Sequence, residues 1–247
     1  MDEALYHRHF AVEDSHWWFQ GRAAVVLSLL DRFCPVGAGE AYLDVGCGTG
    51  LILKALMERG RAIGVDMSPL AVDYARKRGI QEVYCQPLRE VALQGIRVAV
   101  LLDVIEHVED DLELLRQVHD ILLPGGQVLI TVPAYPWLWS QHDVLNHHYR
   151  RYTRPQLAQV LTQSGFKIEK LTFYNTWLFL PALVQKLLSG TKTITDAAET
   201  IPTVPPLLNT LFREIFASER WFLPYLDFPF GVSLLALGRK AAPVSTP

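Results

Sequence analysis

The sequence predicts an α/β fold in which a parallel sheet carries helices on both faces. Two observations support this prediction. Between residues 41 and 133, short apolar runs of strand length alternate with longer amphipathic stretches of helical spacing. The first apolar run leads into the glycine-rich segment Asp44-Val45-Gly46-Cys47-Gly48-Thr49-Gly50. Repeated strand–helix–strand units favour parallel strands, because each helix carries the chain back across the sheet.

Local signals set the boundaries of these elements. Ser68 and Pro69 are typical of an N-cap and a first helical residue, and Gly79 ends the same helix. The predicted strands cover residues 41–45, 61–65, 82–85, 98–102 and 127–132. The predicted helices cover residues 51–59, 69–78 and 110–122. The run 98–102 is wholly apolar, which indicates a strand buried on both faces.

The pattern changes after Pro133. Residues 134–152 are rich in aromatic, histidine and arginine residues, and we expect them to form an inserted loop. Thr153 and Gln156 form a capping-box pattern at the start of the next helix. Two further strands are predicted over residues 166–173 and 232–237.

Three regions follow from this pattern. We expect an N-terminal helical cap in residues 1–39 and an α/β domain in residues 40–173 and 232–240. Residues 174–231 are too long for a plain loop and are predicted to form a hydrophobic helical insertion. Such an insertion covers an apolar substrate or contacts a membrane surface. The alternative is that it fills the core or forms a dimer interface.

Composition narrows the function classes. Half of the 247 residues are apolar and a fifth are charged, as in globular domains. The net charge of −3 shows no basic excess, so no nucleic-acid partner is expected. The three cysteines are widely spaced, so we expect neither disulfides nor a metal site. The N-terminus lacks an apolar signal core, and no apolar run reaches about 18 residues, so a cytoplasmic protein is expected.

The glycine-rich segment indicates the type of ligand. Its GxGxG spacing differs from the GxGxxG spacing of dinucleotide sites, in which a pyrophosphate meets a helix N-terminus. Asp44 leads the segment, and its carboxylate would repel a phosphate but attract a cation. The sequence therefore favours a cationic ligand over a dinucleotide, which argues against a nicotinamide oxidoreductase.

Two further acidic residues end predicted strands. Asp66 ends the second strand, where a carboxylate accepts hydrogen bonds from both hydroxyls of a ribose. Asp103 ends the fourth strand, at the carboxyl edge where such sheets bind ligands. His107 follows at the start of the next segment and is expected to bond to neighbouring backbone.

These three motifs, in this order, resemble the class I methyltransferases that use S-adenosylmethionine (SAM). The resemblance covers residues 40–173 and the last strand. It implies a Rossmann-like seven-stranded sheet in the order 3-2-1-4-5-7-6, with the last strand antiparallel, and SAM as the cofactor.

The resemblance also assigns residues to the cofactor. It implies that the loop residues Asp44, Gly46, Cys47, Gly48 and Gly50 hold the methionine half of SAM. Asp66 then binds the ribose, Met67 flanks the adenine, and Asp103 lies near the methionine moiety. Class members usually carry an aspartate near the adenine amino group, and Gln86 takes that position here.

Within the class, the chain is similar to the ubiquinone-biosynthesis O-methyltransferase type. The shared segments are VIEHVEDD, ITVPAY and HxxRRYTRPQL. This similarity implies methyl transfer to a small-molecule or lipid-like acceptor at an oxygen. Methylation at carbon or nitrogen, and a SAM-binding protein without catalysis, remain the alternatives. The Asp/Asn-Pro-Pro-aromatic segment of nucleic-acid amino-methyltransferases is absent.

The residues predicted to bind the methyl acceptor or to act as its general base lie in the inserted loop. Methylation of a hydroxyl calls for a general base near the reacting oxygen. The candidate bases are His142, Asp143, His147 and His148. Adjacent Arg150 and Arg151 suit a carboxylate or phosphate on the acceptor. The alternative is that they pack against the acidic segment 109–113. Tyr152 and Trp137 are also predicted to line the acceptor site.

The N-terminal segment 16–22 contains two tryptophans, a phenylalanine and Arg22. Aromatic faces attract a sulfonium or line an apolar pocket, and Arg22 is predicted to bind the carboxylate of SAM. The alternative is a hydrophobic helix that packs on the core.

Overall fold

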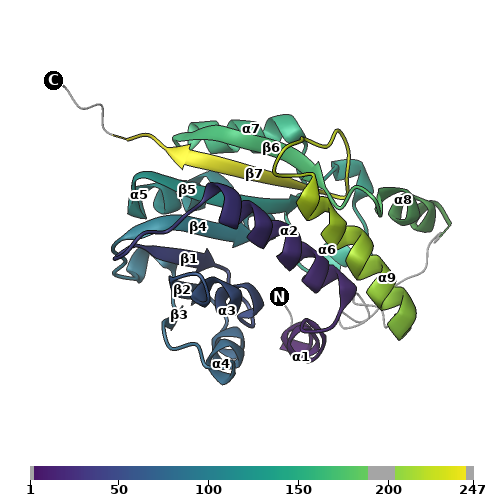
Figure 1. Ribbon diagram of the computed structural model, residues 1–247, viewed down its shortest axis with the longest axis horizontal. Helices are drawn as coiled ribbons and strands as arrows, with labels where there is room; N and C mark the ends of the chain where they lie inside the picture. The colour runs from purple at the N-terminus through teal and green to yellow at the C-terminus, as the bar shows by residue number, and fades with distance from the viewer. Residues whose placement is uncertain (1–2, 189–203, 243–247) are drawn as a thin grey trace.

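The computed structural model describes residues 3–188 and 204–242 and shows one seven-stranded sheet (Figure 1). The strands are β1 (Ala41–Val45), β2 (Arg61–Asp66), β3 (Val83–Cys85), β4 (Ile96–Leu102), β5 (Leu122–Pro133), β6 (Phe166–Tyr174) and β7 (Ser233–Lys240). Their order is β3-β2-β1-β4-β5-β7-β6. Strands β1 to β5 are parallel, whereas β7 runs antiparallel to β5 and β6. The expected strand order and the antiparallel last strand are confirmed.

Helices cover both faces of the sheet. The helices of the described residues are α1 (Glu3–Val12), α2 (Trp17–Phe33), α3 (Leu51–Met57), α4 (Pro69–Lys77), α5 (Asp111–Ile121), α6 (Gln141–Leu145), α7 (Arg154–Gln163), α8 (Phe179–Leu188) and α9 (Pro206–Ala217). Short 3-10 turns lie at η1 (Leu88–Glu90), η2 (Ile105–His107), η3 (Pro136–Leu138) and η5 (Ser218–Trp221). Right-handed crossovers place α3 and α4 on one face and α5 on the other. Figure 1 shows α5 and α7 behind the sheet and α2 in front.

The local signals in the sequence produce the expected helix starts. The Ser68 hydroxyl accepts the N–H of Ala71 at 3.3 Å, with Pro69 as the first helical residue. Thr153 and Gln156 form the predicted capping box of α7. The predicted strand 127–132 is longer than expected: β5 begins at Leu122, which pairs with Ile96 before the register shifts. The apolar run of β4 is buried throughout, as its composition predicts.

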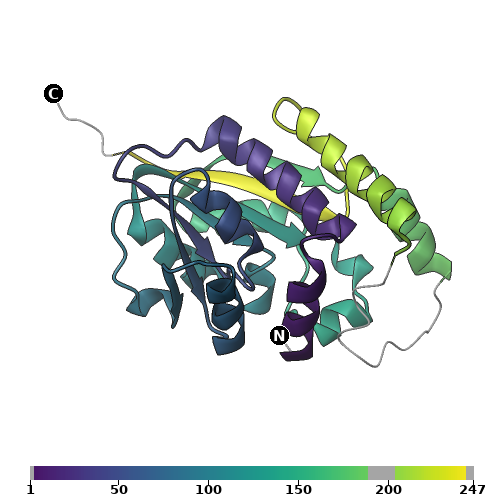
Figure 2. The same ribbon diagram turned by 60° about the horizontal axis from the view of Figure 1, so that its bottom comes forward.

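Helix α2 of the N-terminal cap and helix α9 of the insertion form a single layer. Helices α2 and α9 lie side by side over the sheet (Figures 1 and 2). Trp17 contacts the rings of Phe212 and Phe216 at centroid distances of 5.8 and 6.3 Å. Gly21 permits the close approach, because a Cβ there would lie 2.5 Å from the Phe216 ring. Residues 189–203 of the predicted insertion lie outside the described residues.

Within the described ranges, no helix is long and apolar enough to cross a membrane.

Candidate active site

The glycine-rich loop joins β1 to α3 at the carboxyl edge of the sheet. Gly46 has a φ of 69°, and a Cβ on it would lie 2.7 Å from the Val104 side chain, so only glycine fits. Gly48 has a φ of 54°, yet a Cβ there would meet no atom within 4 Å. The Val104 side chain therefore packs against Gly46, whereas Gly48 leaves open space in which a ligand can contact the backbone.

Asp66 ties the end of β2 to this loop. Its carboxylate accepts the backbone N–H of Gly48 at 2.8 Å and that of Ser68 at 2.9 Å. Burial nevertheless raises the pKa of Asp66 above its usual value. Each carboxylate oxygen can accept a second hydrogen bond, so the predicted ribose contact is compatible with both bonds.

Asp103 forms an ion pair with Arg22 of α2. The Arg22 Nη1 lies 2.5 Å from the Asp103 Oδ2, and the Thr131 hydroxyl donates to Oδ1 at 3.2 Å. Asp103 has a φ of 55°, which turns its side chain at the end of β4. The guanidinium also lies 4.4 Å from the centre of the Trp18 ring. Arg22 thus connects the N-terminal cap to the carboxyl edge of the sheet.

The residues present fit SAM. The buried Arg22 Nε has no hydrogen-bond partner, and this donor matches the predicted contact with the carboxylate of SAM. Burial raises the pKa of Asp44 to about 7, although the positive charge of Arg22 acts to lower it. Together with Asp66 and Asp103, Asp44 makes the site rich in carboxylates, which suits a sulfonium cation.

The predicted adenine residues lie beside each other. Asp66 pairs in register with Cys85, so Met67 and Gln86 follow the paired ends of β2 and β3. The Met67 side chain is 66 % exposed and is available to flank a flat ring. Gln86 is half-buried at the position where the class usually has an aspartate. Their contacts with adenine stay predictions.

The inserted loop holds a buried hydrogen-bond cluster around Asp143. The Asp143 carboxylate bonds to the His148 Nδ1 at 2.9 Å, the Arg151 Nε at 2.7 Å and the Ser140 N–H at 2.8 Å. Burial alone would raise the pKa of Asp143, but these bonds hold it well below its usual value. Asp143 therefore stays ionised and orients the His148 ring.

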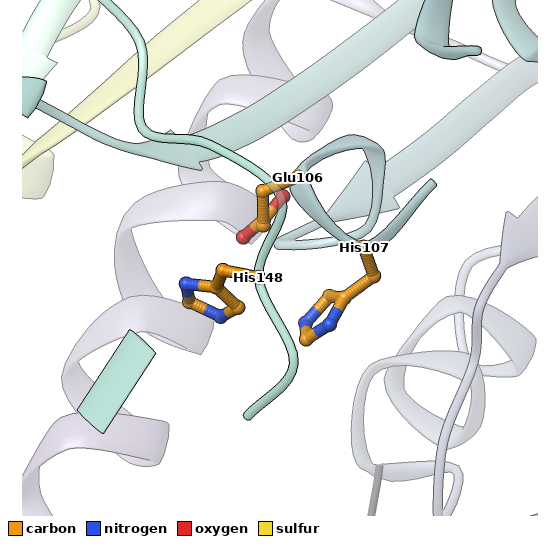
Figure 3. A group of neighbouring side chains, drawn as sticks. All are labelled: Glu106, His107 and His148. Atoms are coloured by element: carbon orange, nitrogen blue, oxygen red, sulfur yellow. The ribbon is translucent and has the colours of Figure 1, made fainter. Parts of the chain in front are cut away.

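Glu106 and His107 of η2 face His148 across a small gap. Figure 3 shows the three side chains converging. The rings of His107 and His148 are 4.6 Å apart, and one ligand atom from each of the three residues lies within 4.8 Å of the others. Neither buried Glu106 oxygen has a hydrogen-bond partner, and burial and the Asp103 charge raise the pKa of Glu106 well above its usual value. This group has the composition of a divalent-metal site, so the expectation of no metal stays untested.

The other predicted bases differ in their surroundings. The ring centres of His142 and His148 are 6.2 Å apart, and His142 is exposed to solvent. His147 has a φ of 56° and lies on the exposed surface. Among the candidate bases, His148 alone combines a carboxylate partner with a place beside the end of β4.

Arg150, Arg151 and Tyr152 support the loop. Arg150 donates to the carbonyl oxygen of Val108 at 3.2 Å and pairs with Asp111 at 3.1 Å. The buried Tyr152 hydroxyl also donates to Asp111, at 2.5 Å. Arg151 forms an ion pair with Asp143. Arg150 therefore contacts the acidic segment 109–113, as the packing alternative expects, whereas Arg151 pairs within the inserted loop. The acceptor contacts of all three residues stay predictions.

An aromatic wall lies beside this site and was not predicted. Tyr135, at the end of β5, stacks on Phe173 with ring centres 5.2 Å apart. Phe179 of α8 lies 5.9 Å from Tyr135, and Trp137 lies 5.4 Å from it on the other side. Trp137 is 55 % exposed, so it remains placed to line an acceptor. The aromatic residues of the insertion were visible in the sequence, but their contact with Tyr135 depends on the tertiary fold.

Comparison with known proteins shows the family of this chain. A family model described as a methyltransferase domain matches residues 18–171, more than half of the chain. The chain belongs to the class I SAM-dependent methyltransferases. It is therefore an enzyme that uses SAM.

Individual relatives agree with this family. The ubiquinone biosynthesis O-methyltransferase of Pseudomonas syringae pv. tomato is 34% identical over 156 residues, which cover 54% of this chain and 67% of that protein. An uncharacterized protein in a transposon of Streptomyces fradiae is 27% identical over 270 residues, covering 98% of this chain and 72% of that protein. A SAM-dependent methyltransferase from Mesorhizobium loti has the same fold, with a TM-score of 0.58 at 21% identity over 88% of this chain and 98% of that one.

The SAM site yields a direct prediction at Asp66. We expect Asp66→Asn to weaken SAM binding about 10- to 100-fold, because it removes a charge-assisted hydrogen-bond acceptor for the ribose. Isothermal titration calorimetry measures the change, and Asp73→Asn on the exposed side of α4 is the matched control. Equal affinities of wild type and Asp66→Asn would show that the ribose binds elsewhere.

Proposed function

We propose that this methyltransferase transfers its methyl group to a hydroxyl of a small, apolar or lipid-like acceptor, with His148 as the general base. The observation that carries this proposal is the Asp143–His148 hydrogen bond of 2.9 Å beside the end of β4. A buried, ionised carboxylate on one ring nitrogen leaves the other nitrogen as the proton acceptor.

Methyl transfer from SAM to a hydroxyl requires a correctly positioned acceptor and a general base. Bound SAM supplies an electrophilic methyl group, which the acceptor oxygen attacks in line. The His148 Nε2 accepts the proton that leaves the acceptor hydroxyl. The ionised Asp143 stabilises the resulting imidazolium, and Arg151 keeps Asp143 in place. The neutral His107, whose pKa burial lowers to about 4, adds no competing positive charge.

The surroundings favour an apolar acceptor. Tyr135 and Phe179 are partly exposed aromatic residues next to the carboxyl edge of the sheet, and the buried Phe173 packs against Tyr135. Relatives named for O-methylation in ubiquinone biosynthesis share about half of this chain, which supports the same acceptor class here. Methylation at carbon or nitrogen is the alternative, and it would not depend on His148 as a base.

The base assignment predicts unequal effects of two histidine substitutions. With a prenylated catechol as the probe acceptor, His148→Ala should lower kcat about 10²- to 10⁴-fold, because proton removal loses its base. His147→Ala, on the exposed surface nearby, should retain wild-type kcat. Both variants should bind SAM as wild type does. The comparison uses kcat from product mass spectrometry, and wild-type kcat in His148→Ala would contradict the base assignment.

We propose further that the insertion contacts a membrane surface from a cytoplasmic location. Leu207 and Leu211 of α9 are 82 % and 50 % exposed, and their helical spacing places them away from Phe216, which contacts α2. A helix with a second, exposed apolar face suits the interface between water and lipid.

Aromatic and basic side chains are also exposed in the segment that follows α9. Trp221 is 65 % and Tyr225 is 71 % exposed. Arg220 lies over Trp221 at 4.8 Å, and Arg32 lies over Tyr225 at 5.5 Å. Tryptophan, tyrosine and arginine are typical of contacts with anionic lipid headgroups.

This surface predicts vesicle binding. The wild-type protein should float with phosphatidylcholine vesicles that contain phosphatidylglycerol, and the Leu207→Gln/Leu211→Gln double variant should float at least several-fold less. Met57→Gln, at an exposed apolar site on α3, is the control. Absence of wild-type flotation, or a dimer that buries α9 in solution, would contradict the membrane contact.

A further inference from the structure

Helix α1 packs against α4 and the glycine-rich loop instead of covering the sheet. Figures 1 and 2 show it turned away from α2. Phe10 stacks on Tyr74 of α4 with ring centres 4.2 Å apart, and Leu5 is buried in a small cluster with Phe19. These contacts fix α1 beside the predicted ribose-binding end of β2.

The face of α1 that meets the cofactor site is polar. Tyr6, His9 and Glu13 follow one another at spacings of three and four residues, so they share one face of the segment. A helix that only fills the core would bury apolar side chains at these positions. The polar face indicates instead that α1 meets a polar ligand or polar groups of the loop.

The first two residues of this face lie near residues predicted to bind the cofactor. Burial and the charge of the nearby Asp66 carboxylate raise the pKa of Tyr6 to about 12, so Tyr6 lies beside the predicted ribose acceptor. The His9 ring packs edge-on against Phe19 with ring centres 5.0 Å apart, and the Arg22 guanidinium lies 6.0 Å from the same Phe19 ring. Burial and the Arg22 charge lower the pKa of His9 to about 3. Tyr6 therefore lies on the side of the predicted ribose acceptor, and His9 lies on the side of the residue predicted to bind the SAM carboxylate.

The third residue, Glu13, joins a buried ion pair that we call the α1 clasp (Glu13, Arg78 and Thr49). The Arg78 Nη2 lies 2.6 Å from the Glu13 carboxylate, and the Thr49 hydroxyl also donates to this carboxylate. The Arg78 Nε donates to the Thr49 carbonyl oxygen at 2.9 Å. The side chains of Arg78 and Glu13 are only 7 % and 5 % exposed. The clasp thus attaches the end of α1 to the loop that holds SAM.

Helix α1 also closes the site. Asp66 is 9 % exposed and Thr49 is 3 % exposed, with Tyr6 and Glu13 of the α1 segment as direct neighbours. A ligand that bonds to Asp66 therefore lies against the α1 segment. Residues 13–16 join α1 to α2.

We propose that Tyr6 and His9 are further cofactor-binding residues and that the α1 clasp controls the exchange of SAM and its product. This proposal rests on SAM binding, which the family shows, and does not depend on the acceptor or on His148. Because the clasp touches neither the acceptor side nor the Asp143 cluster, its loss should change cofactor release rather than proton transfer.

The proposed contact between Tyr6 and the cofactor is tested by removing the Tyr6 hydroxyl. Tyr6→Phe should raise the dissociation constant of S-adenosylhomocysteine about fivefold in calorimetry, the effect of one lost hydrogen bond. The control is Tyr42→Phe, which removes the buried hydroxyl that bonds to the Cys34 carbonyl oxygen. Wild-type affinity in Tyr6→Phe would overturn the contact.

The clasp is tested by cofactor release and by hydrogen exchange without cofactor. In Arg78→Ala, the amides of α1 should exchange faster, and S-adenosylhomocysteine should dissociate at least about tenfold faster in stopped flow. Arg76→Ala, which removes an exposed arginine from the same helix, should change neither. Glu13→Gln keeps the side-chain shape and serves as the second variant where Arg78→Ala does not fold. Faster exchange of α1 with an unchanged dissociation rate would overturn the proposal.

Discussion

The backbone N–H of Gly48 points at the Asp66 carboxylate, and the cofactor site depends on this hydrogen bond of 2.8 Å. It requires the left-handed backbone of the loop, which the side chain of Val104 supports below Gly46. The bond fixes the position of the loop relative to β2 and therefore relative to the predicted ribose acceptor, Asp66. Thr49, the next residue, connects the loop to the α1 segment through its hydrogen bond with Glu13.

The charges near the glycine-rich loop explain why the site suits a cationic ligand. Asp44, Asp66 and Asp103 gather near one loop, and burial raises the pKa of the first two. Arg22 offsets part of the negative charge through its ion pair with Asp103. A ligand with a positive sulfonium and a carboxylate matches this arrangement, since it places opposite charges against the acidic residues and the free Arg22 Nε.

The sequence predicted the sheet well because its signals are local. The apolar runs, the helix caps and the glycine loop each depend on a few neighbouring residues, and their order along the chain implied the topology through a family resemblance. Asp66 and Asp103 were predicted for the same reason, since both follow strands directly. Their predicted contacts with SAM stay predictions.

The parts that sequence reasoning missed depend on contacts between distant segments. His148 and Glu106 are 42 positions apart, and their approach requires the inserted loop to fold back over η2. The roles of Arg150 and Arg151 were open because the sequence does not show that Asp111 and Asp143 lie beside them. The polar face of α1 also lacked a local signal, because polar residues near an N-terminus are usually exposed to solvent.

The central claim is that this chain binds SAM on the glycine-rich loop. The most direct test is calorimetric titration of the purified wild-type protein with SAM and, separately, with NADH. We predict saturable binding of SAM with one site per chain and no binding of NADH. A folded sample that fails to bind SAM, or that binds NADH instead, would contradict the account.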